Sequence, residues 1–264
     1  IQQDLDVPEA VSPEAYRLVK PGADAGMVAK AAELIKAAKD PILLVGHAVQ
    51  CVRVGEQVKA LAEVMGCPVI QTSGGTAFIP GLEDRTFPYL FSSVGNEIVK
   101  QSDLVVAIGT ELGEPMHYGK GHHWKAGNDK RKWIYIELDP AAIGQNRSFD
   151  VPLVGDLRTV VPQLTEALKD SPRQTAPDMA RWIAAEQKRL DDLAADAKNK
   201  KTESGKVHTA SWVVEATKAF PENGIHVRDG GGSVIFTWTY LQSKPHDVIW
   251  NQNFGHLGTG LPYA

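Results

Sequence analysis

Short apolar runs alternate with amphipathic segments along the first 170 residues. The apolar runs predict strands at Pro41–Val45, Pro68–Gln71, Leu104–Ile108, Trp133–Leu138 and Val151–Val154. Apolar residues at helical spacing predict helices at Asp24–Lys39, Gly55–Met65, Val94–Lys100 and Leu157–Leu168. Strands that are apolar on both faces and alternate with helices are typical of a parallel sheet covered on both sides. We therefore predict that residues 1–170 form a Rossmann-like α/β domain, a parallel sheet flanked by helices.

The pattern changes after residue 170. A linker-like stretch leads into a charged helix expected over Asp178–Lys200, so residues 171–206 are predicted to connect two domains. A βα pattern then resumes, with helices expected over Ser211–Phe220 and Val234–Leu241 and strands near residues 224–228 and 247–250. Residues 207–264 are therefore expected to begin a second α/β domain.

Composition narrows the class of protein. Hydrophobic residues make up 43% of the chain, and 28 basic against 32 acidic side chains leave a formal net charge of −4. This balance argues against a nucleic-acid-binding surface, and the apolar runs are too short to span a membrane. The two cysteines, Cys51 and Cys67, form neither a disulfide framework nor a metal-ligand pattern, so we expect a cytoplasmic protein.

The two ends of the chain suggest a piece of a longer protein. The chain opens at Ile1 with no initiator Met and no signal-like segment, and it closes near Leu261-Pro262, where a helix is expected to begin. We therefore expect that the chain is a fragment.

Glycines and carboxylates follow the predicted strands of the first domain. Because the carboxyl ends of parallel strands form the ligand-binding edge of an open sheet, Gly46, Gly109 and Thr110 are candidates for close backbone contact with a ligand. Glu137 and Asp156 also follow strands and are candidates for binding the hydroxyls of a ribose. The alternative is that the glycines merely end strands and the carboxylates cap helices. No complete G-x-G-x-x-G is present, which argues against a hydride-transferring dehydrogenase.

A glycine-rich segment in the second unit gives a sharper signal. The run Asp229-Gly230-Gly231-Gly232-Ser233 lies between a predicted strand and a predicted helix, where backbone amides and a hydroxyl suit a phosphate group. Further along, glycines stand on either side of the large apolar Leu257. Such a segment can contact a flat ligand through its backbone while the leucine side chain lies beneath the ligand.

Together these stretches resemble thiamine-diphosphate enzymes, with acetolactate synthase, oxalyl-CoA decarboxylase and 2-hydroxyacyl-CoA lyase as the most similar groups. The matching stretches are PILLVGHA, the run from SDLVVAIGTEL to MHYGKG, WIYIELDPAAIGQNRSFDVPLVGDL, HVRDGGGS and GHLGTGLPYA. The resemblance covers most of the chain, as a central domain followed by the start of a diphosphate-binding domain. It implies thiamine diphosphate and Mg²⁺ as cofactors, and a C–C bond made or broken next to a carbonyl. It also implies a 2-keto acid or acyl-CoA substrate and a homodimer or homotetramer.

The resemblance assigns roles near the second glycine segment. Leu257 would force the cofactor into its bent shape, and the carbonyl of Gly255 would accept a hydrogen bond from the cofactor's 4′-amino group. His256 would lie beside the thiazolium ring, where it either aids proton transfer or only positions the backbone. The residues implied to lie by the diphosphate are Gly231, Gly232 and Ser233.

In the central domain the resemblance implies a nucleotide crevice, with two departures from the pattern, one of which is Gly46-His47-Ala48 where relatives usually have three glycines. Relatives that bind FAD or ADP usually have Arg where this chain has Glu111, and a carboxylate there would repel the phosphates of a nucleotide. This departure argues against bound FAD or ADP. The residues that match nucleotide-contacting or crevice-lining positions are Gly46, Gly109, Thr110, Glu137, Leu138 and Asp156.

The resemblance nominates no catalytic residue and no metal ligand in this chain. Relatives bind Mg²⁺ through a later Gly-Asp-Gly…Asn motif and receive an activating glutamate from another domain. We therefore expect these 264 residues alone to be inactive. Two other hypotheses stay open at this point, an adenine-nucleotide-binding module and a purely structural α/β module.

Overall fold

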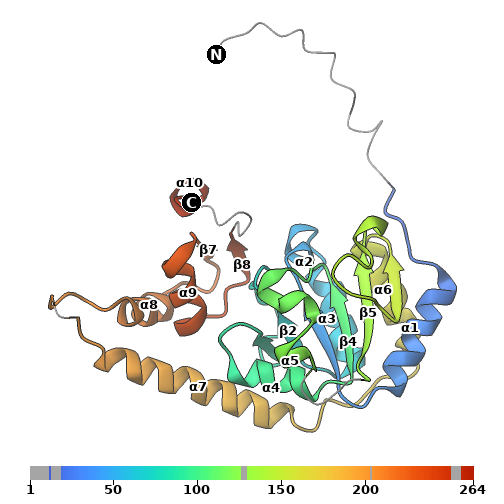
Figure 1. Ribbon diagram of the computed structural model, residues 1–264, viewed down its shortest axis with the longest axis horizontal. Helices are drawn as coiled ribbons and strands as arrows, with labels where there is room; N and C mark the ends of the chain where they lie inside the picture. Colours follow the sequence, from blue (N-terminus) through green and yellow to red (C-terminus); the bar gives the residue numbers. More distant parts are fainter. Residues whose placement is uncertain (1–11, 13–18, 126–129, 203, 251–256) are drawn as a thin grey trace, which may run out of the picture.

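The computed structural model describes residue 12 and residues 19–125, 130–202, 204–250 and 257–264. Its main feature is a parallel sheet of six strands in the order β3-β2-β1-β4-β5-β6 (Figure 1). The strands are β1 (Pro41–Val45), β2 (Val69–Gln71), β3 (Thr86–Pro88), β4 (Leu104–Ile108), β5 (Lys132–Glu137) and β6 (Val151–Val154). The predicted α/β class with a parallel sheet is thus confirmed.

Successive side chains of the central strands supply two separate cores. Leu43 and Val45 of β1 belong to one apolar cluster, whereas Ile42 and Leu44 belong to the other. Because neighbouring strand residues point to opposite faces, a strand that is apolar at every position must be covered on both sides. The continuous apolar runs therefore required helices on both faces of the sheet.

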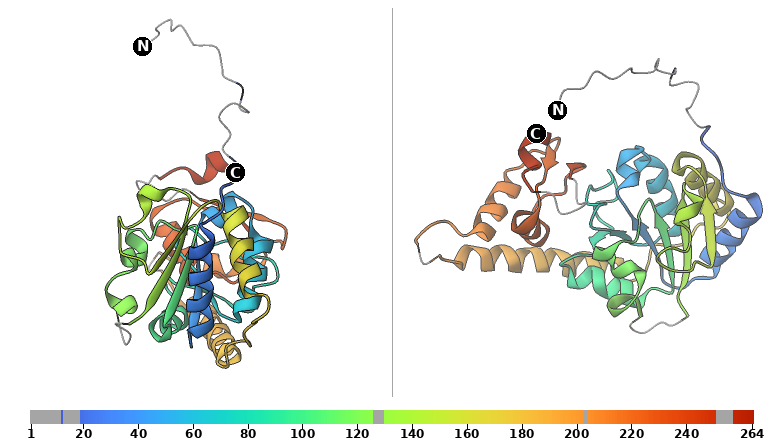
Figure 2. Two further views of the ribbon diagram at one scale, coloured as in Figure 1. Left: turned by 90° about the vertical axis from the view of Figure 1, so that its right-hand side faces the viewer. Right: turned by 45° about the horizontal axis from the view of Figure 1, so that its top comes forward.

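Helices do cover both faces (Figure 2). One face carries α1 (Ala25–Ala37), α3 (Gly55–Met65) and α6 (Leu157–Leu168), whose buried residues join the cluster that contains Leu43. The other face carries α4 (Ser93–Gln101), α5 (His122–Lys125) and the start of α7 (Met179–Asn199). The short helix α2 (Ala48–Cys51) follows β1 directly.

Residues 207–264 contain a smaller unit built on a second parallel sheet. Its strands β7 (Ile225–Val227) and β8 (Asp247–Ile249) pair in parallel register. The helices of this unit are α8 (Thr209–Lys218), α9 (Gly231–Tyr240) and α10 (Gly260–Tyr263). A second parallel sheet in this part of the chain agrees with the expected start of another α/β unit.

Helix α7 contributes to the cores of both units. Met179 and Trp182 near its start are buried in the core of the main sheet, while Ala194 and Ala197 near its end are buried against α8. The helix therefore connects the two units along its length instead of crossing open solvent (Figure 1).

Several elements differ from the predictions. Strand β3 was missed because it is only three residues long, and a run this short carries no periodic signal. Helix α9 begins at Gly231 and not at Val234, because its first turn takes in glycines that favour turns in a sequence pattern. The elements not expected from the sequence are α2, β3, α5 and the 3₁₀ helices η2 (Glu114–Gly119) and η3 (Pro140–Ala142).

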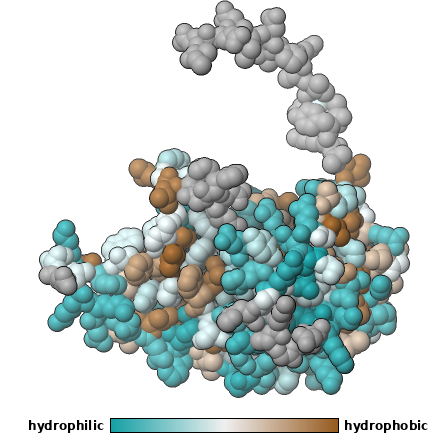
Figure 3. Space-filling view, in the orientation of Figure 1, coloured by the Kyte–Doolittle hydropathy of each residue, from teal (hydrophilic) through white to brown (hydrophobic). Residues whose placement is uncertain are grey.

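The surface is uneven in polarity. Figure 3 shows apolar side chains gathered over the smaller unit, where Ile235 is 47% exposed, whereas hydrophilic residues dominate much of the rest of this face. Among the residues that the structure describes, no helix is both long enough and apolar enough to cross a bilayer.

Candidate functional site

The carboxyl ends of β1 and β4 form a crevice where the sheet changes direction. From β1 the chain builds outward through β2 to β3, and from β4 it builds the other way through β5 to β6. This strand order places the switch point of the sheet between β1 and β4, the position where open α/β sheets bind ligands. Gly46 follows β1 and Gly109 follows β4, so both lie at the switch point.

The two glycines allow the strand ends to approach each other closely. The amide of Gly46 donates to the Ile108 carbonyl at 2.9 Å, and a β-carbon at Gly46 would lie 2.1 Å from the carbonyl oxygen of Gly109. Gly109 has a φ of +59°, a conformation that side chains disfavour. The backbone therefore requires glycine at both positions whether or not a ligand binds.

The crevice has a volume of about 560 Å³, which suits a small ligand. Thr110 and Glu137 line it, and so does Glu111, the residue that departs from the nucleotide-binding pattern. No Lys or Arg is among the described lining residues, so the charged groups that face the space are carboxylates. The full lining is His47, Ala48, Cys51, Thr72, Ser73, Gly74, Gly109, Thr110, Glu111, Gly113, Pro115, Met116, Glu137, Ile249, Trp250 and Tyr263.

The Glu137 carboxylate is held in place at the end of β5. One of its oxygens accepts from the amides of Leu138 at 2.8 Å and Asp139 at 3.2 Å, and the other accepts from the Tyr135 hydroxyl at 3.0 Å. Burial and the neighbouring Glu137 carboxylate raise the pKa of Tyr135, so this hydroxyl remains a donor at neutral pH. Glu137 therefore presents an oriented negative charge to the crevice.

Leu138 and Asp156 are placed differently. Neither lines the crevice, and the side chain of Leu138 is 49% exposed. Asp156 accepts from the Arg158 guanidinium through both carboxylate oxygens, at 2.8 Å and 2.5 Å, and it caps α6 through the Arg158 amide. Its hydrogen bonds to the Arg158 side chain hold the pKa of Asp156 below its usual range. In this arrangement Asp156 acts as a helix cap, the alternative considered from the sequence.

The smaller unit brings two distant glycine segments together through Asp229. One carboxylate oxygen accepts from the amides of Gly230 at 2.7 Å and Gly258 at 2.8 Å, and the other accepts from Gly260 at 3.1 Å. These backbone hydrogen bonds hold the pKa of Asp229 below its usual range. Sequence reasoning included Asp229 in the motif but did not recognise it as the link. The sequence signal for this role was the position of Asp229 directly after a predicted strand.

The amino-terminal end of α9 lies beside Leu257. Gly230 caps this ten-residue helix without any side-chain hydrogen bond to its free amides, and the Ser233 hydroxyl donates to the Gly230 carbonyl at 2.7 Å. Leu257 is 71% exposed, and a β-carbon on Gly231 would lie 3.4 Å from its side chain. A β-carbon on Gly232 would meet nothing within 4 Å. The helix end thus combines free donors, open space and an exposed apolar side chain.

Other predicted positions lie outside the described residues or were missed. Gly255 and His256 fall within residues that the structure does not describe. The run Thr72-Ser73-Gly74 lines the crevice but was not nominated, although it follows β2 as Gly46 follows β1. Trp250 also lines the crevice, and only the packing of the two units reveals that. The described part of the chain has no group of three His, Cys, Asp or Glu side chains placed to hold a metal ion.

Comparison with known proteins agrees with the resemblance to thiamine-diphosphate enzymes. Residues 28–164, just over half of the chain, match the family described as thiamine pyrophosphate enzyme, central domain. Human 2-hydroxyacyl-CoA lyase 1 is 25% identical over 245 residues, which cover 92% of this chain and 41% of that protein.

Two acetolactate synthases also match. The enzyme of Mycobacterium avium is 34% identical over 165 residues, which cover 61% of this chain and 25% of that protein. The large subunit of acetolactate synthase isozyme 3 of Escherichia coli strain K12 is 24% identical over 269 residues, which cover 97% of this chain and 44% of that protein. The chain thus spans less than half the length of these relatives.

Proposed function

This chain belongs to the thiamine pyrophosphate enzyme family through its central domain, and we propose that it works as part of a thiamine-diphosphate-dependent enzyme. The reaction proposed is the making or breaking of a C–C bond next to a carbonyl group. Relatives named 2-hydroxyacyl-CoA lyase and acetolactate synthase support this reaction class. The proposed substrate is accordingly a 2-keto acid or an acyl-CoA compound.

The observation that carries the proposal is the end of helix α9. Free backbone amides at a helix amino-terminus attract a diphosphate through hydrogen bonds and through the helix dipole. The open space at Gly232 leaves room for that group, and the exposed Leu257 offers an apolar surface beside it. The residues present therefore fit the diphosphate end of the cofactor.

We assign the roles in the smaller unit as follows. Gly231, Gly232 and Ser233 bind the diphosphate, and Leu257 supports the bent form of the cofactor. Gly255 and His256, outside the described residues, are proposed to contact its pyrimidine and thiazolium rings. When bound, thiamine diphosphate supplies the electron sink for the reaction, while the protein orients the reactants. Mg²⁺ is proposed to bind the same diphosphate through ligands outside these 264 residues.

We propose that the crevice of the central domain holds no FAD or ADP. Glu111 and Glu137 face it, and no described Lys or Arg lines it to balance the phosphates of a nucleotide. The alternative, an adenine-nucleotide site, draws support from the switch-point position and from the resemblance of crevice residues to nucleotide-contacting positions. A thermal-shift measurement with ADP, FAD and NAD separates the two, because stabilisation by any of them contradicts our proposal.

The proposed assembly is a homodimer or homotetramer in the cytoplasm. Apolar side chains exposed on the smaller unit, among them Trp212 at 64% and Val207 at 74%, are consistent with burial by other parts of an assembly. A purely structural module is the remaining alternative. It predicts no response to any cofactor.

The proposal is tested in a protein that carries these residues together with the other parts found in the relatives. Thiamine diphosphate with Mg²⁺ is expected to stabilise that protein and to support decarboxylation of 2-keto acids or cleavage of 2-hydroxyacyl-CoA. Leu257→Ala is expected to lower turnover by roughly tenfold or more, because the cofactor loses its support, while diphosphate affinity changes much less. Leu261→Ala, an exposed leucine of the same segment, is the matched control.

These 264 residues alone are expected to show no thiamine-dependent turnover. Turnover by the pure chain contradicts that expectation. Equal activity of the Leu257→Ala and Leu261→Ala proteins contradicts the assigned role of Leu257. A longer protein that neither binds the cofactor nor turns over these substrates contradicts the proposed function as a whole.

A further inference from the structure

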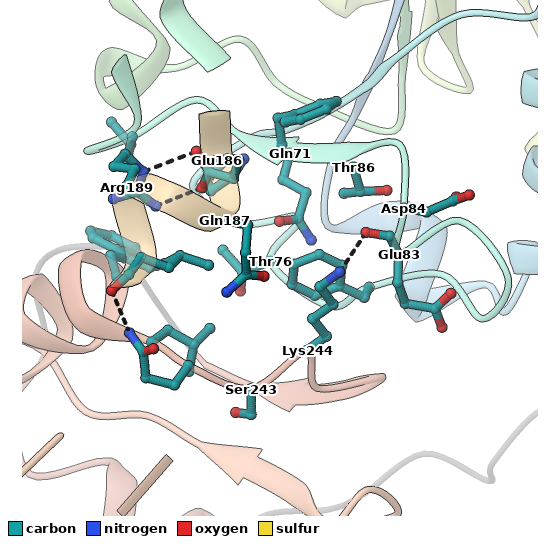
Figure 4. A pocket seen from close by; sticks show the side chains of 18 of the residues that line it. Gln71, Thr76, Glu83, Asp84, Thr86, Glu186, Gln187, Arg189, Ser243 and Lys244 are labelled. Atoms are coloured by element: carbon teal, nitrogen blue, oxygen red, sulfur yellow. Dashed lines mark hydrogen bonds and ion pairs between the residues drawn. The ribbon is translucent and has the colours of Figure 1, made fainter. Parts of the chain in front are cut away.

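A second cavity, of about 130 Å³, lies between the β2–β3 edge of the main sheet, α7 and the segment that follows α9 (Figure 4). This volume is close to the roughly 150 Å³ of an apolar cavity that holds a benzene molecule. Much of its wall is apolar, with Phe87 and Leu90 from the sheet side, Ile183 from α7, and Trp238 and Leu241 from the smaller unit. The cavity therefore has room for a small organic molecule with an apolar part.

Arg228 lines this cavity and carries an unbalanced buried charge. The residue is 4% exposed, and its Nη1 donates to the Thr76 hydroxyl at 2.9 Å. Its Nε and Nη2 are buried and have no hydrogen-bond partner among the described residues, nor does any described carboxylate form an ion pair with it. Burial lowers the pKa of Arg228 to about 10, so the guanidinium is still charged at neutral pH.

Three acidic side chains line the cavity, and each has a partner other than Arg228; Asp84, whose side chain is 74% exposed, lies 3.8 Å from the Arg85 Nε. Glu83 pairs with the His246 ring at 2.8 Å, and Glu186 accepts from the Arg189 guanidinium at 2.6 Å and 2.9 Å. Lys244 donates to the backbone carbonyl of Glu83 at 2.8 Å, a contact drawn in Figure 4, and forms no ion pair with a described carboxylate. Two cations on the cavity wall, Arg228 and Lys244, therefore lack an acidic partner within the described part of the chain.

The free donors of Arg228 have a definite geometry. Nε–H and Nη2–H lie on the same edge of the guanidinium plane and point in parallel, the arrangement that binds both oxygens of one carboxylate. A buried charge without such a partner is costly, so an anion that supplies the two acceptors gains from the contact. We propose that this cavity binds a small carboxylate ligand, with its carboxylate on Arg228 and its short apolar chain against Phe87, Ile183 and Trp238.

A carboxylate fits this site better than a phosphate. The free edge of Arg228 provides two donors, which satisfy one carboxylate group, whereas a phosphate leaves further oxygens facing apolar walls. The site is built by the main sheet, α7 and the smaller unit together, and none of its named contacts involves the segment from Leu257 onward. The inference is therefore independent of the proposed cofactor site.

Binding is measured by calorimetry and by tryptophan fluorescence, since Trp238 lines the cavity. Butyrate is the probe, and butyramide is its uncharged match in shape. Butyrate is expected to bind saturably, and butyramide roughly tenfold or more weakly, because a hydrogen-bonded charge pair is lost. Inorganic phosphate at the same ionic strength is expected to bind more weakly than butyrate.

The variant that tests the site is Arg228→Gln, which is expected to weaken butyrate binding by roughly tenfold or more. Arg53→Gln is the control, since Arg53 is exposed and does not line the cavity. Arg228→Lys keeps the charge without the paired donors and is expected to bind with intermediate affinity. Circular dichroism establishes that each variant is folded.

Three results overturn the proposal. They are equal binding of butyrate and butyramide by the unaltered protein, undiminished binding by folded Arg228→Gln, and tighter binding of phosphate than of butyrate. If Arg228→Gln does not fold, the comparison of butyrate with butyramide and the Arg228→Lys protein still decide the outcome.

Discussion

At the scale of single residues, a glycine after a strand can reflect either contact with a ligand or close packing of the backbone. Gly46 and Gly109 were nominated because glycine after a strand allows close approach to a ligand. In the structure each glycine is required by the approach of the β1 and β4 ends to each other, since a β-carbon at Gly46 would overlap the Gly109 carbonyl. Packing alone therefore accounts for these glycines, and a ligand role for them remains a prediction.

Gly46→Ala is expected to destabilise the protein by about 1–3 kcal/mol, because the added methyl group must displace the backbone after β4. Chemical denaturation measures this change. The matched control is Gly113→Ala in the segment after β4, where the new β-carbon meets only the Pro115 ring at 3.9 Å and the cost is expected to be within about 0.5 kcal/mol. Similar stabilities of the two variants contradict the packing argument.

At the scale of elements, a buried histidine makes the stability of the β7–β8 sheet depend on pH. His226 of β7 is 6% exposed, and its ring meets that of Phe220 at 3.7 Å between centroids. Burial, together with the charge of nearby Arg228, lowers the pKa of His226 to about 4. The ring is therefore neutral in the folded protein over the range in which an unfolded chain already binds a proton.

Because the unfolded state binds more protons between pH 6.5 and 4, the stability due to His226 is complete above pH 6.5 and is lost as the pH falls toward 4. At pH 5 the expected loss is about 1–2 kcal/mol. Denaturation curves at pH 7 and pH 5 measure it. His226→Gln is expected to reduce the pH dependence by that amount, whereas His47→Gln, at an exposed position, is expected to leave it unchanged. Equal pH dependence in all three proteins contradicts the assignment.

At the scale of the whole molecule, α7 and one acidic residue join the two units. Helix α7 is buried in the core of each, and Glu83 contacts Lys244 and His246 from across the junction. The amide of Phe78 also donates to the Pro245 carbonyl at 2.7 Å. The smaller unit is thus held against the main sheet by contacts in addition to the covalent connection.

Trypsin is expected to cut first between Lys200 and Lys206, because this stretch follows α7 and contains exposed lysines. The two pieces are expected to remain together in size-exclusion chromatography, since the contacts of Glu83 and Phe78 do not depend on that connection. Glu83→Gln removes the carboxylate that contacts the His246 ring and is expected to promote separation of the nicked protein. Separation of the unaltered protein on cleavage, or a first cut within α7, contradicts this arrangement.

Part of the candidate site could be predicted from the sequence, and part depends on side-chain geometry. Strand-end rules placed Gly109, Thr110 and Glu137 at one edge of the sheet, and the structure brings them into one crevice, whereas Gly46 lines a neighbouring cavity instead. The same rules placed Asp156 there, but its local hydrogen bonds to Arg158 and its role as a helix cap occupy its oxygens. Local pairing of this kind depends on side-chain geometry, which residue spacing does not encode.

The sequence by itself determined the fold class and most of the regular elements, because uninterrupted apolar runs can be buried only between two layers of helices. It also determined the family, since the matching motifs lie in order along the chain. Only the tertiary structure decided which strand ends face each other, how Asp229 joins two glycine segments, and where the charge of Arg228 is buried. Each of these depends on contacts between residues far apart in sequence, and such contacts leave no local pattern.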